Sequence, residues 1–163
     1  MGILEMLHLR RRTAFGKYVS AAVIRKLLRS SEIRPPEVKH VQFVVILGDD
    51  TTNPQQVSEM LGRVIDTLFQ HHATVTSVLP SLLVGLLGAP FPEGNSPEAR
   101  QELVSALLRG HDEQIRVAHG ECDAPVGNFG SPTRYAYGAL IPGFSGILKK
   151  LIETKFGTAV EIS

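Results

Sequence analysis

The chain has 163 residues, of which 43% are hydrophobic and 20% charged, and its formal net charge is +1. This size and composition favour one domain with one sizeable core over two independent domains. The nearly balanced charge and the pI near 8.0 argue against nucleic acid as a partner. The single cysteine, Cys122, cannot form an internal disulfide, and no signal-peptide pattern opens the chain, so a cytoplasmic location is expected.

Residues 1–36 predict an N-terminal helical segment and a linker. Four apolar residues recur at helical spacing behind Ser20, which is suited to cap a helix. They are Val23, Ile24, Leu27 and Leu28. Pro35 and Pro36 then disfavour helix and predict an extended connection. We interpret the arginines at 10–12 as solvated surface, because no aromatic residues are interleaved with them.

The next segments predict buried strands. Val41–Leu47 is a β-branched run typical of a buried strand. The stretch from Thr67 to Pro92 contains no Asp, Glu, Lys or Arg, and its length would suit a membrane span. Histidines, hydroxyl residues and prolines interrupt it, so we expect no span. We predict two short strands instead, at Thr74–Val78 and Leu82–Leu87, joined by a turn at Leu79–Ser81.

Three amphipathic helices are predicted along the rest of the chain. Asn53 and Ser96 each precede a proline, which is the pattern of an N-cap followed by the first helical residue. The apolar stripe of the first helix consists of Val57, Met60, Leu61, Val64, Ile65, Leu68 and Phe69. The stripe of the second consists of Val104, Leu107 and Leu108, and that of the third of Phe144, Ile147, Leu148 and Leu151.

The remaining strands complete the predicted order. QIRVAHGEC and DAPVGNFG predict two strands around a turn, and TAVEIS predicts a last strand after Gly157. The order of strand, helix, strand hairpin, helix, strands, helix and strand favours an α+β or mixed α/β domain with one sheet. Such a pattern does not by itself fix a function.

Four stretches resemble, in the same order, the catalytic domains of the class III nucleotide cyclases, the adenylate and guanylate cyclases. They are RRTAFGKYVSAAVIRKLL, GLLGAP, APVGNFGSPTRYAY and TKFGTAVEIS. The resemblance extends from about Arg11 to Ser163 and implies an α+β fold with a ferredoxin-like core and one sheet flanked by helices. Family members usually continue through another helix and two strands, so we expect a cyclase-like domain at 37–163 that is shortened at its C-terminus.

The resemblance also implies a chemistry. In the family, two aspartates hold two Mg²⁺ or Mn²⁺ ions while the ribose 3′ hydroxyl attacks the α-phosphate of ATP or GTP and pyrophosphate leaves. A lysine and an aspartate or threonine recognise the purine, an asparagine orients the ribose, and an arginine stabilises the transition state. The sites form between two chains, which implies a homodimer or a cyclase-like protein partner.

This chain departs from the family at the metal positions. The first aspartate falls on Leu47, and the second, seven residues before Gly88, falls on Ser81. Leucine cannot bind magnesium. Asp49 and Asp50 would substitute only if the register shifted, and we interpret them as residues of a solvated turn.

The purine and transition-state positions differ as well. The purine positions fall on Ser77 and Gly138, and the asparagine and arginine positions fall on Ser145 and Lys149. Lys149 keeps a positive charge but lacks the planar fork that holds phosphate through two bonds. The chain therefore lacks the expected residues of both halves of the shared site.

These departures favour a catalytically inactive domain that needs no cofactor and acts in signalling by dimerising or by regulating a partner. Two alternatives stay open. The domain could be an active cyclase that uses Asp49 or Asp50 with Mg²⁺ or Mn²⁺, or a sensor that binds a neutral small molecule in the former nucleotide cleft.

Other motifs carry weaker signals. His119 and Cys122 lack the four-ligand pattern of a structural zinc site, as do His71 and His72, and we interpret Cys122 as a small buried hydrophobic residue. Gly127–Gly130 has the sequence GNFG without the lysine of a phosphate-binding loop, so it predicts a tight hairpin turn.

Overall fold

The computed structural model describes residues 35–49, 53–79, 81–111, 113–131 and 134–163. The predicted N-terminal helix, the arginines at 10–12 and Asp50 lie outside these residues.

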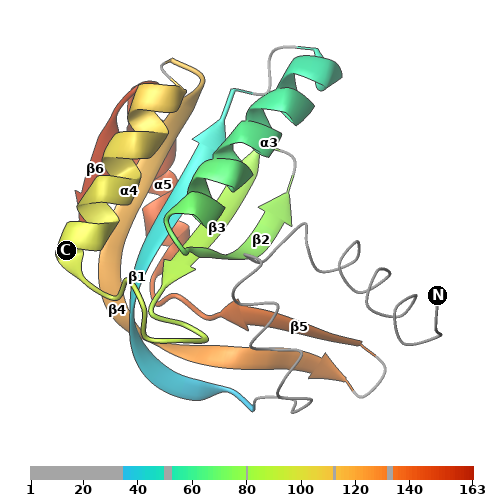
Figure 1. Ribbon diagram of the computed structural model, residues 1–163, viewed down its shortest axis with the longest axis vertical. Helices are drawn as coiled ribbons and strands as arrows, with labels where there is room; N and C mark the ends of the chain where they lie inside the picture. The colour runs from blue at the N-terminus through green and yellow to red at the C-terminus, as the bar shows by residue number, and fades with distance from the viewer. Residues whose placement is uncertain (1–34, 50–52, 80, 112, 132–133) are drawn as a thin grey trace.

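Within the described residues the domain is built on one six-stranded sheet (Figure 1). The strands are β1 (Glu37–Gly48), β2 (Thr74–Leu79), β3 (Leu82–Leu87), β4 (Ile115–Ser131), β5 (Arg134–Ala139) and β6 (Ala159–Ile162). The order is β2-β3-β1-β4-β5, and β6 pairs with β4. The β4–β6 pair is parallel, and the other pairs are antiparallel. This single sheet confirms the predicted α+β class.

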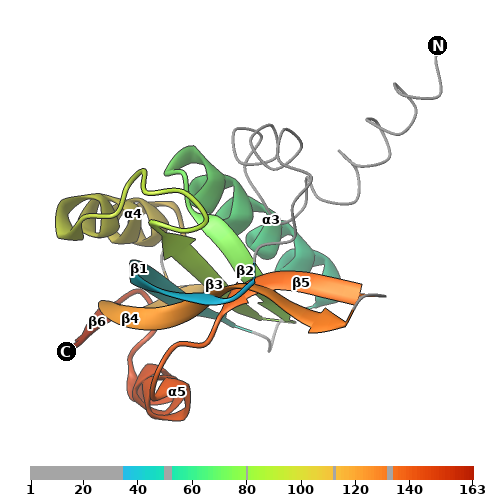
Figure 2. The same ribbon diagram turned by 90° about the horizontal axis from the view of Figure 1, so that it is seen from below.

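Helices cover both faces of the sheet. They are α3 (Pro54–Gln70), α4 (Pro97–Gly110) and α5 (Phe144–Glu153). Figure 2 shows α3 and α4 on one face and α5 on the other. The predicted caps are confirmed: Asn53 Oδ1 accepts the Gln56 N–H at 3.0 Å, and Ser96 Oγ accepts the Ala99 N–H at 3.1 Å. Among the described residues, no helix has both the length and the hydropathy needed to cross a bilayer.

Side chains of β1 alternate between two core layers. Val41, Phe43 and Val45 are buried in the layer that contains α5, whereas Val44 and Ile46 are buried in the layer that contains α3 and α4. Burial on both faces explains why this strand is a continuous apolar run. It also explains the charge-free hairpin, because β3 lies next to β1 and five of its six residues, Leu83 to Leu87, are buried.

The structure corrects three expectations about the strands. β4 is one strand of 17 residues, with no turn between the two predicted segments, and Gly127–Gly130 lies inside it. This continuity arises because β4 pairs with β1 up to Val126 and with β5 from Val126 onward. β1 begins at Glu37, four residues before the predicted strand at Val41–Leu47, and β5 was not predicted. The start of β1, the end of β4 and β5 form an arm away from α3 and α4 (Figure 1).

Candidate functional site

The two residues that the sequence resemblance assigns to the metal positions, Leu47 and Ser81, are neighbours in the structure. Leu47 pairs with Leu82 across the β1–β3 ladder, and the next N–H, of Gly48, donates to the carbonyl oxygen of Ser81 at 2.6 Å. Ser81 is buried and has a φ of 64°, which suits the tight turn before β3. The pairing of β1 with β3 therefore places Leu47 close to Ser81, as expected if both belonged to one former metal site.

The donor atoms at this end of the sheet do not fit a magnesium site. The side chain of Leu47 contains no oxygen, and it is half-buried and packs against the core layer of α5. Ser81 offers one hydroxyl, whereas Mg²⁺ in proteins is held by carboxylates. Asp49 follows β1, and its backbone N–H donates to the carbonyl oxygen of Gln114 at 2.8 Å. No group of three or more His, Cys, Asp or Glu side chains in the described part of the chain is arranged to hold a metal ion.

The purine positions lie on two different strands. Ser77 belongs to β2 and pairs with Val84 just after a register shift in the ladder. Gly138 belongs to β5 and pairs with Gly127. A Cβ atom on Gly138 would meet no atom within 4 Å, so space for a side chain exists there.

The residues that the resemblance assigns to the ribose and transition-state positions lie on α5. Ser145 and Lys149 are one helical turn apart and are both exposed, whereas Ile147 and Leu151 of the same helix are buried in the core. α5 thus packs as the sequence predicted, and the side chains at the two family positions contact solvent.

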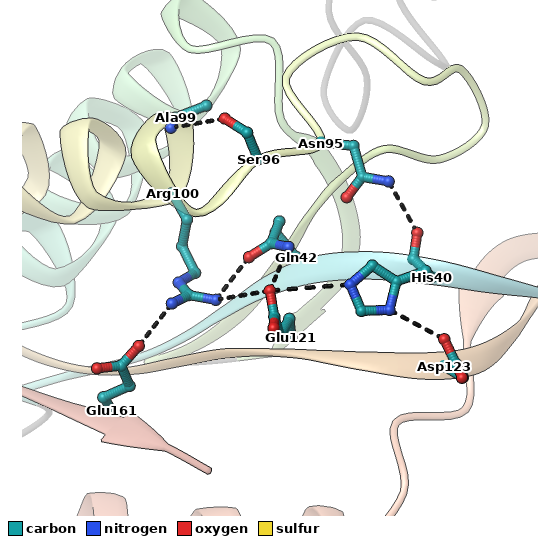
Figure 3. Close-up of polar contacts among 9 residues, drawn as sticks. All are labelled: His40, Gln42, Asn95, Ser96, Ala99, Arg100, Glu121, Asp123 and Glu161. Carbon is teal, nitrogen blue, oxygen red and sulfur yellow. Dashed lines mark hydrogen bonds and ion pairs between the residues drawn. The ribbon is translucent and has the colours of Figure 1, made fainter.

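A second group of polar residues, which we call the Arg100 cluster, lies on the face of the sheet opposite α5, under the start of α4, and Figure 3 shows all of its members except His119. Its members are His40 and Gln42 of β1, Arg100 of α4, His119, Glu121 and Asp123 of β4, and Glu161 of β6. This cluster was not predicted from the sequence, although His119, Glu121 and Asp123 have the alternation of a polar strand face.

Arg100 connects α4 to three strands. Its side chain is only 5% exposed. Nη1 donates to Gln42 Oε1 at 2.5 Å and Nη2 to Glu161 Oε1 at 2.6 Å, and Nη1 lies 3.8 Å from Glu121 Oε2. Gln42, itself buried, donates from Nε2 to Glu121 Oε2 at 2.9 Å. This hydrogen bond is the main reason why the pKa of the Glu121 carboxyl is lowered.

The cluster has an exposed end and a buried end. At the exposed end, His40 Nδ1 lies 2.9 Å from Asp123 Oδ1 and His40 Nε2 lies 3.8 Å from Glu121 Oε2. At the buried end, His119 Nδ1 and Arg100 Nε have no hydrogen-bond partner. The pKa of His119 is lowered first by burial and then by the charge of Arg100, and Glu161 opposes this effect.

The structure separates the histidine and the cysteine that were weighed as metal ligands. His119 lies on the α4 face of β4 with Arg100, whereas Cys122 packs against the core layer of α5. Cys122 is half-buried, and burial, with a smaller effect of Asp123, raises the pKa of its thiol. It packs as a small hydrophobic residue at the margin of the core.

Comparison with known proteins gives matches in structure only. No protein-family model matches the chain, and no curated protein matches it significantly. The guanylyl cyclase Cya2 is 15% identical with a TM-score of 0.58, over 78% of this chain and 76% of that chain. The adenylyl cyclase CyaB from P. aeruginosa is 14% identical with a TM-score of 0.61, over 77% and 78%. The guanylate cyclase domain of RhGC from Catenaria anguillulae, in complex with GTP, is 8% identical with a TM-score of 0.63, over 76% and 78%.

At sequence identities of 8% to 15%, the similarity to these proteins shows a common fold and nothing finer. The sheet and the helices on its two faces agree with it. The chain therefore has the fold of a nucleotide cyclase catalytic domain.

Proposed function

We propose that this domain is a non-catalytic relative of the nucleotide cyclases that acts by pairing, either with a second copy of itself or with a cyclase-like partner that it regulates. The observation that carries the proposal is the pair Leu47 and Ser81. They stand together at the end of β1 and the start of β3, where two aspartates would hold the metal ions of an active cyclase.

The positions on α5 support the same proposal. Ser145 lacks the amide that would orient a ribose, and Lys149 lacks the fork of an arginine. A chain that keeps one half of a shared site can complete the site of a partner. This chain has substitutions in both halves, so pairing with an active domain would leave both composite sites incomplete and would inhibit that domain.

The arm offers an apolar surface for pairing with a second copy. Val38 is 70% exposed and Leu140 is 60% exposed. Both flank Pro125, because Val38 pairs with Pro125 in the ladder and the Leu140 N–H donates to the Pro125 carbonyl oxygen at 3.0 Å. Exposed apolar side chains that adjoin one another are typical of an interaction surface.

Nucleotide binding tests the loss of catalysis. We expect no detectable heat when ATP or GTP is titrated into the protein with or without Mn²⁺, and no cyclic nucleotide product. Metal-dependent binding would contradict the proposal and favour the alternative of an atypical cyclase. Replacing Asp49 and Asp50 by Asn distinguishes an atypical cyclase from a non-catalytic domain. The substitutions would abolish the activity of the former and leave the latter unchanged.

Sedimentation velocity tests the pairing. We expect a concentration-dependent dimer, and we expect Leu140→Lys to weaken it by at least about tenfold, because burying a leucine contributes roughly 1.5–3 kcal/mol. Ile152→Lys is the matched control, since Ile152 is equally exposed but lies on α5. A dimer weakened equally by both substitutions would argue against the arm, and a protein that is monomeric and does not inhibit an active cyclase domain would contradict the proposal.

A further inference from the structure

β6 is a short strand whose three apolar residues, Ala159, Val160 and Ile162, pack at the margins of the two core layers. It has four residues and pairs only with β4 among the described strands, in the register Val117 to Ala159 through Gly120 to Ile162. Three of its residues are half-buried and Glu161 is exposed. The part of β4 beneath it is buried, with Val117 and Ala118 fully inaccessible. A short strand at the edge of the sheet therefore pairs with a part of β4 whose side chains are buried.

One polar contact ties this strand to the opposite element. Glu161 of β6 accepts the 2.6 Å hydrogen bond from Arg100 of α4, and Gln42 of β1 orients the same guanidinium. A charge-assisted bond to a buried arginine is stronger than a neutral one. Arg100 thus acts as a latch that holds β6 against α4 and β1 (Figure 3).

His119 lies beside this latch in an environment that suits only its neutral form. It is 4% exposed and its Nδ1 has no partner, as is also true of Arg100 Nε. The charged and titratable groups on this face are Arg100 from α4, Glu161 from β6, Glu121 and Asp123 from β4 itself and, at the exposed end, His40 from β1. The residue of β1 opposite His119 is the apolar Val44. A proton on His119 would place a second buried cation beside Arg100.

We propose that β6 is an acid-released strand: protonation of His119 opens the Arg100–Glu161 latch, frees β6 from the sheet and uncovers residues Val117–Gly120 of β4. The event goes beyond nucleotide chemistry and does not depend on the proposed pairing. Its product is an exposed edge of β4, which an extended segment can pair with.

The sign of the effect follows from the lowered pKa of His119. Release of β6 lets water reach the histidine, so the open state has the ordinary pKa of about 6.5 and binds a proton more readily than the closed state. The latch is fully stable above pH 6.5 and weakens as the pH falls toward the pKa of the closed state. One proton taken up on opening shifts the equilibrium by up to about tenfold per pH unit in this window.

Hydrogen exchange followed by mass spectrometry tests the proposal on the full chain between pH 7.5 and 5. Protection factors of Ala159–Ile162, each corrected for the intrinsic rate at that pH, should fall by up to about tenfold per pH unit below 6.5. Those of Val41–Ile46 should fall less. The Val117 N–H, which donates to the Thr158 carbonyl oxygen at 3.1 Å, should follow β6.

Three variants decide which group is responsible. His119→Gln should remove the pH dependence of β6. His111→Gln is its matched control, because His111 is also 4% exposed with a partnerless Nδ1 but lies after the end of α4. Glu161→Gln should lower the protection of β6 already at pH 7.5, and it keeps the proposal testable if His119→Gln does not fold, since Glu161 is exposed.

Three results would overturn the proposal. The first is a parallel loss of protection in β6 and β1, which would indicate global unfolding. The second is an unchanged pH dependence in His119→Gln, or its loss in His111→Gln. The third is a Glu161→Gln variant whose β6 is as protected as in the parent chain.

Discussion

At the scale of single residues, the Arg100 cluster is asymmetric in its exposure. The Arg100 side chain is 5% exposed, whereas those of Glu121 and Glu161 are 47% and 58% exposed. Water can therefore solvate either carboxylate after the arginine is lost, but it cannot solvate the arginine after the carboxylates are lost. The free-energy cost of breaking a buried ion pair comes mainly from the charge that is left behind.

This asymmetry predicts which substitution is worse. Arg100→Met fills a similar volume and should lower the free energy of unfolding by only about 1 kcal/mol, mainly through the lost bond to Gln42. The double substitution Glu121→Gln and Glu161→Gln leaves the buried cation without an anion and should lower the free energy of unfolding by more than Arg100→Met does, because the guanidinium that remains is not solvated. Urea denaturation at pH 7.5 measures both. A larger loss for Arg100→Met than for the double substitution would contradict this account.

The two candidate sites differ in how far the sequence could predict them. Leu47 and Ser81 could be placed together because each is fixed by counting from a motif on its own strand. The Arg100 cluster joins residues that are 58 and 61 positions apart, from Arg100 to Gln42 and to Glu161. No local pattern encodes such a separation, since it arises only when α4 lies across three strands.

At the scale of elements, local signals predicted the helices well and the strand ends poorly. The proline after each N-cap and the apolar stripes fix α3 and α4, because these interactions are made within a few residues of the chain. β4 was expected to turn after Cys122, because Gly and Pro residues favour turns. Pairing with β1 on one side and β5 on the other holds it extended instead.

Packing between β4 and β6 gives a prediction for a glycine. A Cβ on Gly120 would lie 2.7 Å from the carbonyl oxygen of Ile162 and 2.9 Å from Phe43 Cζ, and the backbone of β6 would have to move. Gly120→Ala should therefore destabilise the domain by about 1–3 kcal/mol and lower the protection of β6 in hydrogen exchange.

Gly138→Ala is the matched control within a strand. A Cβ on Gly138 would meet nothing within 4 Å, so this variant should stay within about 0.5 kcal/mol of the parent chain. Equal stability of the two variants in urea denaturation would show that β6 adapts to the added methyl group without cost.

At the scale of the whole molecule, the layer between the sheet and α3 and α4 contains two buried histidines. His119 adjoins Arg100, and His111, just after α4, lies near Arg63. Burial is the larger cause of the lowered pKa of each, and the neighbouring arginine adds to it. The domain therefore places two neutral histidines beside fixed positive charge, one at each end of α4.

This arrangement predicts the pH dependence of global stability. A histidine whose pKa is lowered in the folded state contributes stability above the unfolded pKa of about 6.5 and loses it as the pH falls toward the folded pKa. The free energy of unfolding should thus decrease from pH 7 to 5, by at most about 1.4 kcal/mol per pH unit for each histidine. Glu121, whose pKa is lowered, loses its contribution only as the pH approaches the ordinary glutamate value of 4.5, so it adds a slope of the same sign only near pH 5. Urea denaturation of the parent chain and of the double variant His111→Gln and His119→Gln measures the effect. A slope that persists in the double variant would place the responsible protons elsewhere, whereas a flat profile in the double variant would assign the slope to these two imidazoles together.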